Sequence, residues 1–197
     1  MEIGETLVVR SRAEWRAWLA ANFRTADEIW LVNPNKASGK PRLLYNDAVE
    51  EALCFGWIDS TVKKLDEESS VQRYTPRNPK SSYSQQNRER LRWLAEHGLI
   101  HPSVLPGIQP VLEEEFIFPE DILDAIRGNP AAWQHYQAFS PAYRRIRVAY
   151  IDSARARPEG AVRAGTDRNG RMSNRRRPPL GTAALAAVLA LAGCSQM

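Results

Sequence analysis

The sequence predicts an α+β fold: a small antiparallel sheet with packed helices, followed by a three-helix subdomain and a disordered tail. Two segments, 57–65 and 71–76, alternate with a period of two around a polar turn, which is typical of a β-hairpin. Apolar residues recur at helical spacing before this hairpin and again in the last third of the chain. Helices and strands do not alternate regularly, which argues against a parallel sheet wound from βαβ units.

The first third of the chain predicts a helix, a strand and a loop. Ser11 and Glu14 have the spacing of a capping box, in which a hydroxyl and a carboxylate each accept a free backbone N–H. The helical spacing behind them ends near Asn22. Residues 28–33 are rich in strand-forming side chains, and the polar run at 35–41 predicts a loop.

The middle of the chain predicts a helix that leads into the hairpin. Asn46 or Asp47 caps this helix, and Gly56 marks either its end or a close packing contact. The first hairpin strand, at 57–65, alternates with a period of two, so we expect one of its faces to carry the side chains of Trp57, Asp59, Thr61, Lys63 and Leu65. A basic, irregular loop at 76–82 follows the second strand.

The remaining residues predict helices and a connector. Ser84 caps a helix that stops at Gly98, and the turn-forming residues of 99–118 predict a connector. Three helices follow, beginning near Pro119, Pro130 and Ser140. We therefore divide the chain into an α+β domain at 1–98, a connector at 99–118, a helical subdomain at 119–159 and a disordered basic tail at 160–197.

The positive charge of the chain lies in its tail. The whole sequence carries a net charge of +4 and residues 160–197 carry +5, from six Arg and one Asp, which leaves −1 on residues 1–159. A body without net positive charge and without a recognisable reader motif argues against specific nucleic-acid binding.

The tail ends in a segment laid out like a bacterial lipoprotein signal. A basic start after Met172 precedes an apolar run and the lipobox-like residues 191–194. Such a signal acts only at an N-terminus, so we interpret the tail as a read-through, frameshift or gene-fusion product. The alternatives are a disordered tail with a weakly apolar end and a membrane anchor. The N-terminus lacks an export signal and no apolar run reaches about 20 residues, so the sequence predicts a cytoplasmic protein without a membrane partner.

No residue pattern predicts a metal or another cofactor. Cys54 and Cys194 provide neither a disulfide framework nor metal-ligand spacing, and Cys54 lies beside an apolar helical stripe, as an inert buried thiol does. His97 and His101 have the spacing of two zinc ligands on a helix, but Gly98 interrupts that helix and no Glu completes the pattern.

Several segments between residues 8 and 159 follow one another in the order of a known family. The most specific is EEALCFGWID at 50–59, and the others are EWRAWL at 14–19, LDEE at 65–68, QRYTPRNPKSSYSQQN at 72–87 and NPAAWQHYQAFSPAYRR at 129–145. Together they resemble the YdeI/OmpD-associated family, which is also called bacteriocin-protection. The resemblance implies a YjbR/CyaY-like α+β fold with an appended helical segment, and a protective role against bacteriocins or antimicrobial peptides rather than a catalytic step.

The second hairpin strand and the loop after it form the candidate ligand site. Residues 71–92 carry six Arg or Lys and one Glu, interleaved with aromatic side chains, and Arg suits phosphate or carboxylate groups. The predicted ligand-binding residues are Trp57, Asp59, Lys63, Arg73, Tyr74, Arg77, Lys80, Ser84 and Asn87. A solvated polar face neutralised by nearby carboxylates is the alternative interpretation.

Asp59 has two interpretations. It forms a structural ion pair, with Lys63 on its own strand or with Arg73 across the hairpin, or it serves as a catalytic acid with a pKa shifted by burial. Trp57, two residues earlier, has the character of a core residue as well as of a ligand platform.

We therefore predict a non-enzymatic, cytoplasmic binding module of the stress- or bacteriocin-protection type that engages an anionic small molecule or an acidic protein partner. The alternative is a small hydrolase or transferase acting on an anionic substrate, with Asp59 as acid/base and Arg73 and Arg77 as substrate clamps. A closed pocket joining these side chains favours the enzyme, and an open patch favours the binding module. The sequence leaves the oligomeric state open.

Overall fold

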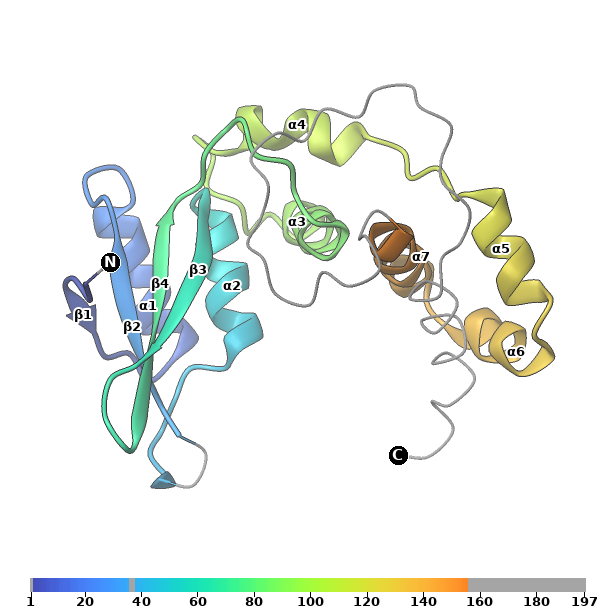
Figure 1. The fold of residues 1–197 in the computed structure, drawn as a ribbon. Coiled ribbons are helices and arrows are strands. Elements are labelled where there is room, and N and C mark those ends of the chain that lie inside the picture. Colours follow the sequence, from blue (N-terminus) through green and yellow to red (C-terminus); the bar gives the residue numbers. More distant parts are fainter. Residues whose placement is uncertain (1, 36–37, 156–197) are drawn as a thin grey trace. The chain divides into compact units, whose positions relative to one another are not determined.

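The computed structural model describes residues 2–35 and 38–155, which divide into two compact units (Figure 1). The described residues of Met1–Tyr83 and Arg90–Glu113 form the first unit, and those of Ser84–Glu89 and Glu114–Met197 form the second. The tail at 160–197, which we predicted to be disordered, lies outside the described residues.

A four-stranded sheet with the order β1-β2-β4-β3 forms one layer of the first unit. Its strands are β1 (Thr6–Leu7), β2 (Ile29–Pro34), β3 (Trp57–Lys64) and β4 (Ser69–Pro76). The α+β class and the hairpin are confirmed, because β4 pairs antiparallel with both β3 and β2. β1 runs parallel to β2, so the sheet is mixed and not antiparallel throughout as predicted. A strand of two residues is too short to leave a period-two pattern in the sequence.

Seven helices complete the described residues. They are α1 (Arg12–Asn22), α2 (Tyr45–Cys54), α3 (Gln85–Glu96), α4 (Leu105–Glu113), α5 (Glu120–Arg127), α6 (Pro130–Ala138) and α7 (Pro141–Arg155). α5, α6 and α7 are the three C-terminal helices that the sequence predicts. Within the described part of the chain, no helix combines the length and the apolar character that crossing a membrane requires.

Helix α4 lies inside the segment that we predicted to be a connector. Its two prolines suggested turns, but Pro106 occupies the first helical turn, where the backbone N–H has no partner within the helix. Pro110 lies further inside α4 and removes one backbone hydrogen bond. The predicted connector therefore contains a helix of nine residues that the sequence did not predict.

The helix starts follow the capping predictions in part. Ser11 caps α1 as predicted, because its hydroxyl accepts the Glu14 N–H at 3.2 Å. The predicted cap of α2 is wrong, since the helix starts at Tyr45 without a side-chain cap. Asn46 and Asp47 accept hydrogen bonds from arginine side chains instead. At the other end of α2, Gly56 adopts a φ of 74°, which favours glycine and lets the chain turn into β3.

The strict alternation expected for β3 is broken by an irregularity in the hairpin register. Asp59 pairs with Tyr74, whereas Lys63 pairs with Val71, and the register shifts between Asp59 and Val62. Paired residues of neighbouring strands share a face, and Tyr74 and Val71 lie on opposite faces of β4. The prediction that Asp59 and Lys63 share one face is therefore wrong, because the shift reverses the alternation.

One face of the sheet packs against α1 and α2 and forms the core of the first unit (Figure 1). Aromatic rings fill its centre: Trp15 packs edge-on against Tyr74 at 5.3 Å and stacks on Trp18 at 5.4 Å. Trp57 contacts Trp18 at 5.8 Å and donates its indole N–H to the Phe23 carbonyl oxygen at 3.0 Å. Such aromatic pairs each contribute about 0.5–1.5 kcal/mol beyond the area that they bury.

A buried carboxylate joins α1 to α2. Glu51 on α2 is only 2% exposed. Its two carboxylate oxygens accept hydrogen bonds from Arg12 Nε at 2.5 Å and from Arg16 NH1 at 2.6 Å. Arg16 also donates to the Leu99 carbonyl oxygen at 2.8 Å. A carboxylate is costly to bury unless it is paired and hydrogen-bonded, and the two arginines of α1 supply both.

The second unit has its own small core. Buried side chains of α5, α6 and α7 meet there: Ile122, Ile126, Ala132, Tyr136, Val148 and Ile151. At the start of α3, Glu89 accepts two hydrogen bonds from Arg145 of α7, at 2.8 and 2.6 Å. This bidentate geometry is the strongest form of an Arg–carboxylate contact.

We expect Glu51→Gln to lower the free energy of unfolding by about 1–3 kcal/mol, because charge-assisted hydrogen bonds to two arginines are lost. Glu50→Gln is the matched control: Glu50 makes a single contact with Arg12, at 2.9 Å, and we expect a loss below about 1 kcal/mol. Urea unfolding of the full chain, followed by circular dichroism, measures both. Equal losses in the two variants would contradict the role of Glu51.

Candidate functional site

The structure distributes the nine predicted ligand-binding residues over four places. On the face of the sheet that packs against the helices lie Trp57, Asp59 and Tyr74, and on the opposite face lie Lys63 and Arg73. The loop after β4 carries Arg77 and Lys80, and the start of α3 carries Ser84 and Asn87. The last two belong to the second unit and the other seven to the first.

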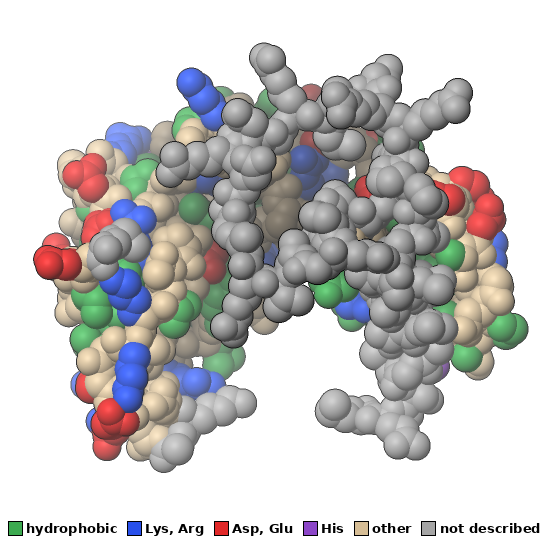
Figure 2. All heavy atoms as spheres, viewed as in Figure 1, with side chains coloured by type: hydrophobic (Ala, Val, Ile, Leu, Met, Phe, Trp, Pro, Cys, Tyr) green, Lys and Arg blue, Asp and Glu red, His purple; other side chains and the backbone are tan. Residues whose placement is uncertain are grey.

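On the outer face of the sheet, an ion pair covers a buried tryptophan. Trp30 pairs with Arg73 in the register of β2 and β4 and is fully buried. Arg73 Nε donates to Glu28 Oε2 at 2.6 Å, and the Trp30 indole N–H donates to Glu28 Oε1 at 3.0 Å. Lys63 Nζ lies 5.6 Å from the centre of the Trp30 ring. Figure 2 shows Lys and Arg side chains beside acidic ones on the viewed face of this unit.

The contacts of Glu28 change its ionisation. The hydrogen bond from Trp30 and then the contacts of Arg73 lower the pKa of the Glu28 carboxyl group, because both stabilise its charged form. The positive charge of Arg73 is therefore already neutralised by the carboxylate of Glu28, which immediately precedes β2. This matches the alternative interpretation of that position, a basic residue balanced by a nearby acid.

Two of the predicted ligand residues are part of the core. Trp57 and Tyr74 are each 1% exposed, and the indole N–H of Trp57 is occupied by a carbonyl oxygen. Burial, followed by the nearby charge of Asp59, raises the pKa of the Tyr74 hydroxyl. Both rings therefore pack in the core and hold the strands of the hairpin against the helices.

Asp59 belongs to a small polar network at the edge of the core. Its Oδ2 accepts the hydroxyl hydrogen of Tyr45 at 3.0 Å and an amide hydrogen of Gln72 at 2.8 Å. Burial, followed by the charge of Asp59 and this hydrogen bond, raises the pKa of Tyr45, so the phenol stays neutral. The predicted ion pairs of Asp59 with Lys63 or Arg73 do not form, because both cations lie on the opposite face.

The loop after β4 holds Arg77 in a fixed place. Its guanidinium lies 3.4 Å from the centre of the Tyr83 ring and donates to the carbonyl oxygens of Asn78, at 3.2 Å, and Ser81. The Arg77 backbone N–H donates to the Gly56 carbonyl oxygen at 2.9 Å, which anchors the loop to the start of β3. Lys80 is exposed, and its backbone N–H donates to the Asn78 side chain at 2.9 Å.

The start of α3 is capped as predicted. The Ser84 hydroxyl accepts the Asn87 N–H at 3.3 Å, so it is occupied by the first turn of its own helix. The two candidate histidines lie apart from any ligand cluster: His97 stacks on Trp93 at 4.1 Å, and His101 contacts Phe23 at 4.8 Å. Among the described residues, no three His, Cys, Asp or Glu side chains gather as a metal ion requires.

Three residues that were not predicted complete these sites. Glu28 neutralises Arg73, and Tyr45 and Gln72 bind Asp59. Gln72 carried a signal, since a polar residue at an inward position of a strand requires a partner. Glu28 and Tyr45 lie outside the hairpin, and nothing in the sequence around them indicates that they contact Arg73 or Asp59.

Cys54 is a buried thiol, as its place beside the apolar stripe predicts. It is fully buried in the core of the first unit. Burial, followed by the charge of Glu51, raises the pKa of the thiol to about 11. A thiolate nucleophile requires the opposite environment.

We expect Arg73→Gln to raise the pKa of Glu28 toward its ordinary value, since the variant removes a cation and its hydrogen bond. In the native protein the lowered pKa stabilises the fold at neutral pH, and this stabilisation is lost as the pH falls through the pKa of folded Glu28. A carbon-13 NMR titration of the Glu28 carboxyl group measures the change. Arg10→Gln, at an exposed position before α1, is the control. An unchanged pKa of Glu28 in Arg73→Gln would contradict the pairing.

We expect Cys54 to react with a thiol reagent at pH 8 at least about 100-fold more slowly in the native protein than in urea. A pKa of about 11, against the ordinary 9.0, lowers the thiolate fraction by that factor before burial restricts access. The measurement uses Cys194→Ser, so that Cys54 is the single thiol. Equal rates in the folded and unfolded protein would show that Cys54 is accessible.

Comparison with known proteins finds two family models along the chain. Residues 7–106 match the Domain of unknown function (DUF8412), and residues 115–160 match the family described as Bacteriocin-protection, YdeI or OmpD-Associated. No curated protein and no solved structure matches the chain. The resemblance to the YdeI/OmpD-associated family is thus confirmed at 115–160, whereas the EEALCFGWID segment lies within the other match.

The first match covers half of the chain and contains the sheet, the helices packed on it and the loop after β4. The second covers α5, α6 and α7. The chain therefore belongs to the DUF8412 family through residues 7–106, and its residues 115–160 match the family model described as Bacteriocin-protection, YdeI or OmpD-Associated.

Proposed function

We propose that this protein is a non-enzymatic, cytoplasmic binding module of the bacteriocin-protection type, whose loop after β4 engages an anionic small molecule or an acidic partner. The observation that carries the proposal is the fixed position of Arg77 beside an exposed Lys80. The name of the family matched at residues 115–160 supports a protective role.

The charge of the segment around the loop supports an anionic ligand. Residues 69–88 contain no Asp or Glu, and they carry four Arg or Lys. Arg73 is neutralised by Glu28, so the proposal rests on the loop and not on the strand. Within the described residues, no hydrogen bond or ion pair holds the Lys80 ammonium group.

The geometry of Arg77 supports binding at low entropic cost. The Tyr83 ring and two carbonyl oxygens hold the guanidinium in one place, so little conformational freedom is lost when a phosphate or carboxylate arrives. A guanidinium has five N–H donors, and the loop carbonyls use part of them. The remaining donors and the exposed hydroxyls of Ser81 and Ser82 suit an anion.

The alternative, a hydrolase or transferase, has weaker support. It requires Asp59 as acid/base with Arg73 and Arg77 as substrate clamps. The register of the hairpin directs Asp59 and Arg73 to opposite faces of the sheet. Asp59 therefore does not share a site with Arg73, and Arg77 lies on the loop after β4.

We expect anions to bind the full chain with an affinity that Lys80→Ala lowers about three-fold to ten-fold, since one charge-assisted contact is lost. A calorimetric titration with inorganic phosphate, nucleotides and a short acidic peptide measures this, and the affinity is expected to fall as salt is added. Arg77→Ala removes the second cation, and Arg10→Ala is the control for net charge.

The Arg10→Ala control distinguishes an anion site on the loop from nonspecific electrostatic attraction of anions to the protein. Arg10 is exposed and lies outside the loop, so Arg10→Ala removes the same charge without touching the site. Unchanged binding in Arg10→Ala with weaker binding in Lys80→Ala supports the proposal. Equal effects in both variants, or no binding by any of the probes, would overturn it.

A further inference from the structure

The carboxylate of Asp59 has two partners, and both are neutral. Its Oδ2 accepts from the Tyr45 hydroxyl and the Gln72 amide, while its Oδ1 accepts no hydrogen bond from the described residues. No ion pair within the described ranges involves Asp59. The charge of this side chain is thus held in position but not neutralised by contact, unlike that of Glu28 or Glu51.

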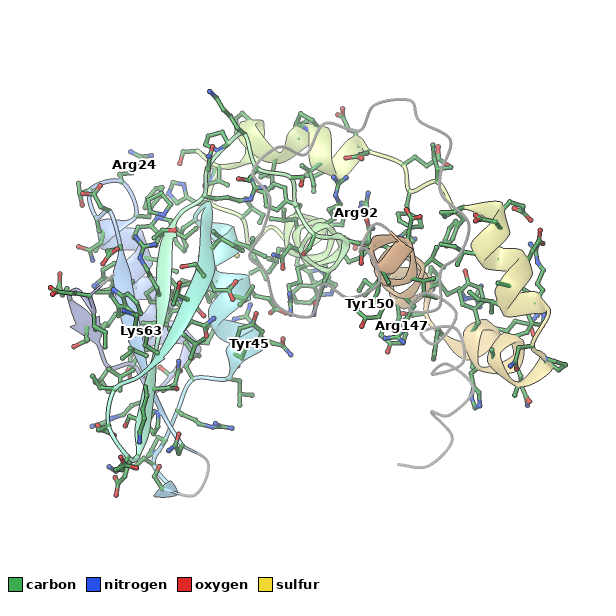
Figure 3. The ribbon with its side chains drawn as sticks, in the orientation of Figure 1. Arg24, Tyr45, Lys63, Arg92, Arg147 and Tyr150 are labelled. Carbon is green, nitrogen blue, oxygen red and sulfur yellow. The ribbon has the colours of Figure 1, made fainter. Side chains whose placement is uncertain are left out.

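Two exposed side chains with apolar groups lie on the same side of the hairpin as this carboxylate. Tyr45, whose hydroxyl binds it, is 54% exposed. Val62 pairs with Gln72 on the same face of the hairpin and is 59% exposed. Figure 3 shows Tyr45 beside the start of α2, on the other side of the hairpin from Lys63. A carboxylate beside exposed apolar groups suits a ligand that combines a positive charge with an apolar chain.

Three cations on neighbouring parts of the fold contact groups other than Asp59. Arg90 donates to the Asn46 side chain at 2.8 Å, next to Tyr45. Lys64 binds Glu67 at 2.6 Å in the hairpin turn. Lys63 lies on the opposite face, over the Trp30 ring.

We propose that Asp59, with Tyr45 and Val62 on the same side of the hairpin, binds a small organic cation that carries an alkyl arm, such as an alkylammonium ion. The ammonium group donates to Oδ1 of Asp59, and the alkyl arm covers Val62 and the Tyr45 ring. A bare divalent cation fits less well, because the described residues supply a single carboxylate there and such ions require several oxygen ligands.

The network prepares the carboxylate for this ligand. Gln72 is buried and Tyr45 is neutral, so their two hydrogen bonds fix the plane of the carboxylate without cancelling its charge. The ligand therefore meets an oriented acceptor and loses little binding energy to rearrangement. This site shares no residue with the basic loop and takes a ligand of the opposite charge.

The test is an NMR titration of the full chain with n-hexylammonium, following the Val62 methyl and Gln72 side-chain amide signals. We expect saturable shifts at these groups, and none with hexan-1-ol or hexanoate at the same concentration. Asp59→Asn, which keeps the shape and removes the charge, is expected to weaken binding at least about ten-fold. Val62→Thr, which replaces one methyl group by a hydroxyl, is expected to weaken it about three-fold.

Three results would overturn the proposal. They are the absence of saturable shifts with n-hexylammonium, equal affinity in Asp59→Asn, and binding of a lysine-rich peptide without binding of n-hexylammonium. If Asp59→Asn disturbs the fold, Val62→Thr still tests the apolar contact, and hexan-1-ol with the unmodified protein still tests the need for a positive charge. Lys80→Ala is the control for the other site and is expected to leave n-hexylammonium binding unchanged, so failure at one site is distinguishable from failure at the other.

Discussion

The first unit depends on the buried carboxylate of Glu51. Removing this charge from water is unfavourable, and Arg12 and Arg16 of α1 compensate it with direct hydrogen bonds. The same contact fixes α1 against α2, and Arg16 extends it to the carbonyl oxygen of Leu99. The two helices thus form one layer, on which the aromatic core and the inner face of the sheet pack. The buried thiol of Cys54 lies within this layer, where the charge of Glu51 helps to keep it protonated.

The two faces of the sheet have different chemistry because of one irregularity in the hairpin. The register shift after Asp59 directs this carboxylate to the helix side and Lys63 to the outer side. On the outer side, Glu28 and Arg73 neutralise each other above Trp30. A hairpin with strict alternation has its acid and its base on one face, where they neutralise each other. The shift therefore preserves an acidic group without a cationic partner.

The candidate site could be predicted from the sequence only in part. The basic, aromatic character of the segment around Arg77 and Lys80 is visible in the residue order, because it depends on composition. The neutralisation of Arg73 by Glu28 is not visible there, since Glu28 precedes Arg73 by 45 residues. Trp57 and Tyr74 combine polar tips with large rings, and their places in the core depend on α1, which packs against them.

The α+β class, the hairpin, the cap at Ser11 and the three C-terminal helices could be predicted from the residue order alone. These features follow from periodicity and turn chemistry within about ten residues, where the physical causes are local. The parallel strand β1, the helix α4 and the partners of each charged side chain depend on contacts between distant parts of the chain. Asp59 shows the reason: its face depends on a register shift and its partners on the packing of α2, and neither is encoded by neighbouring residues.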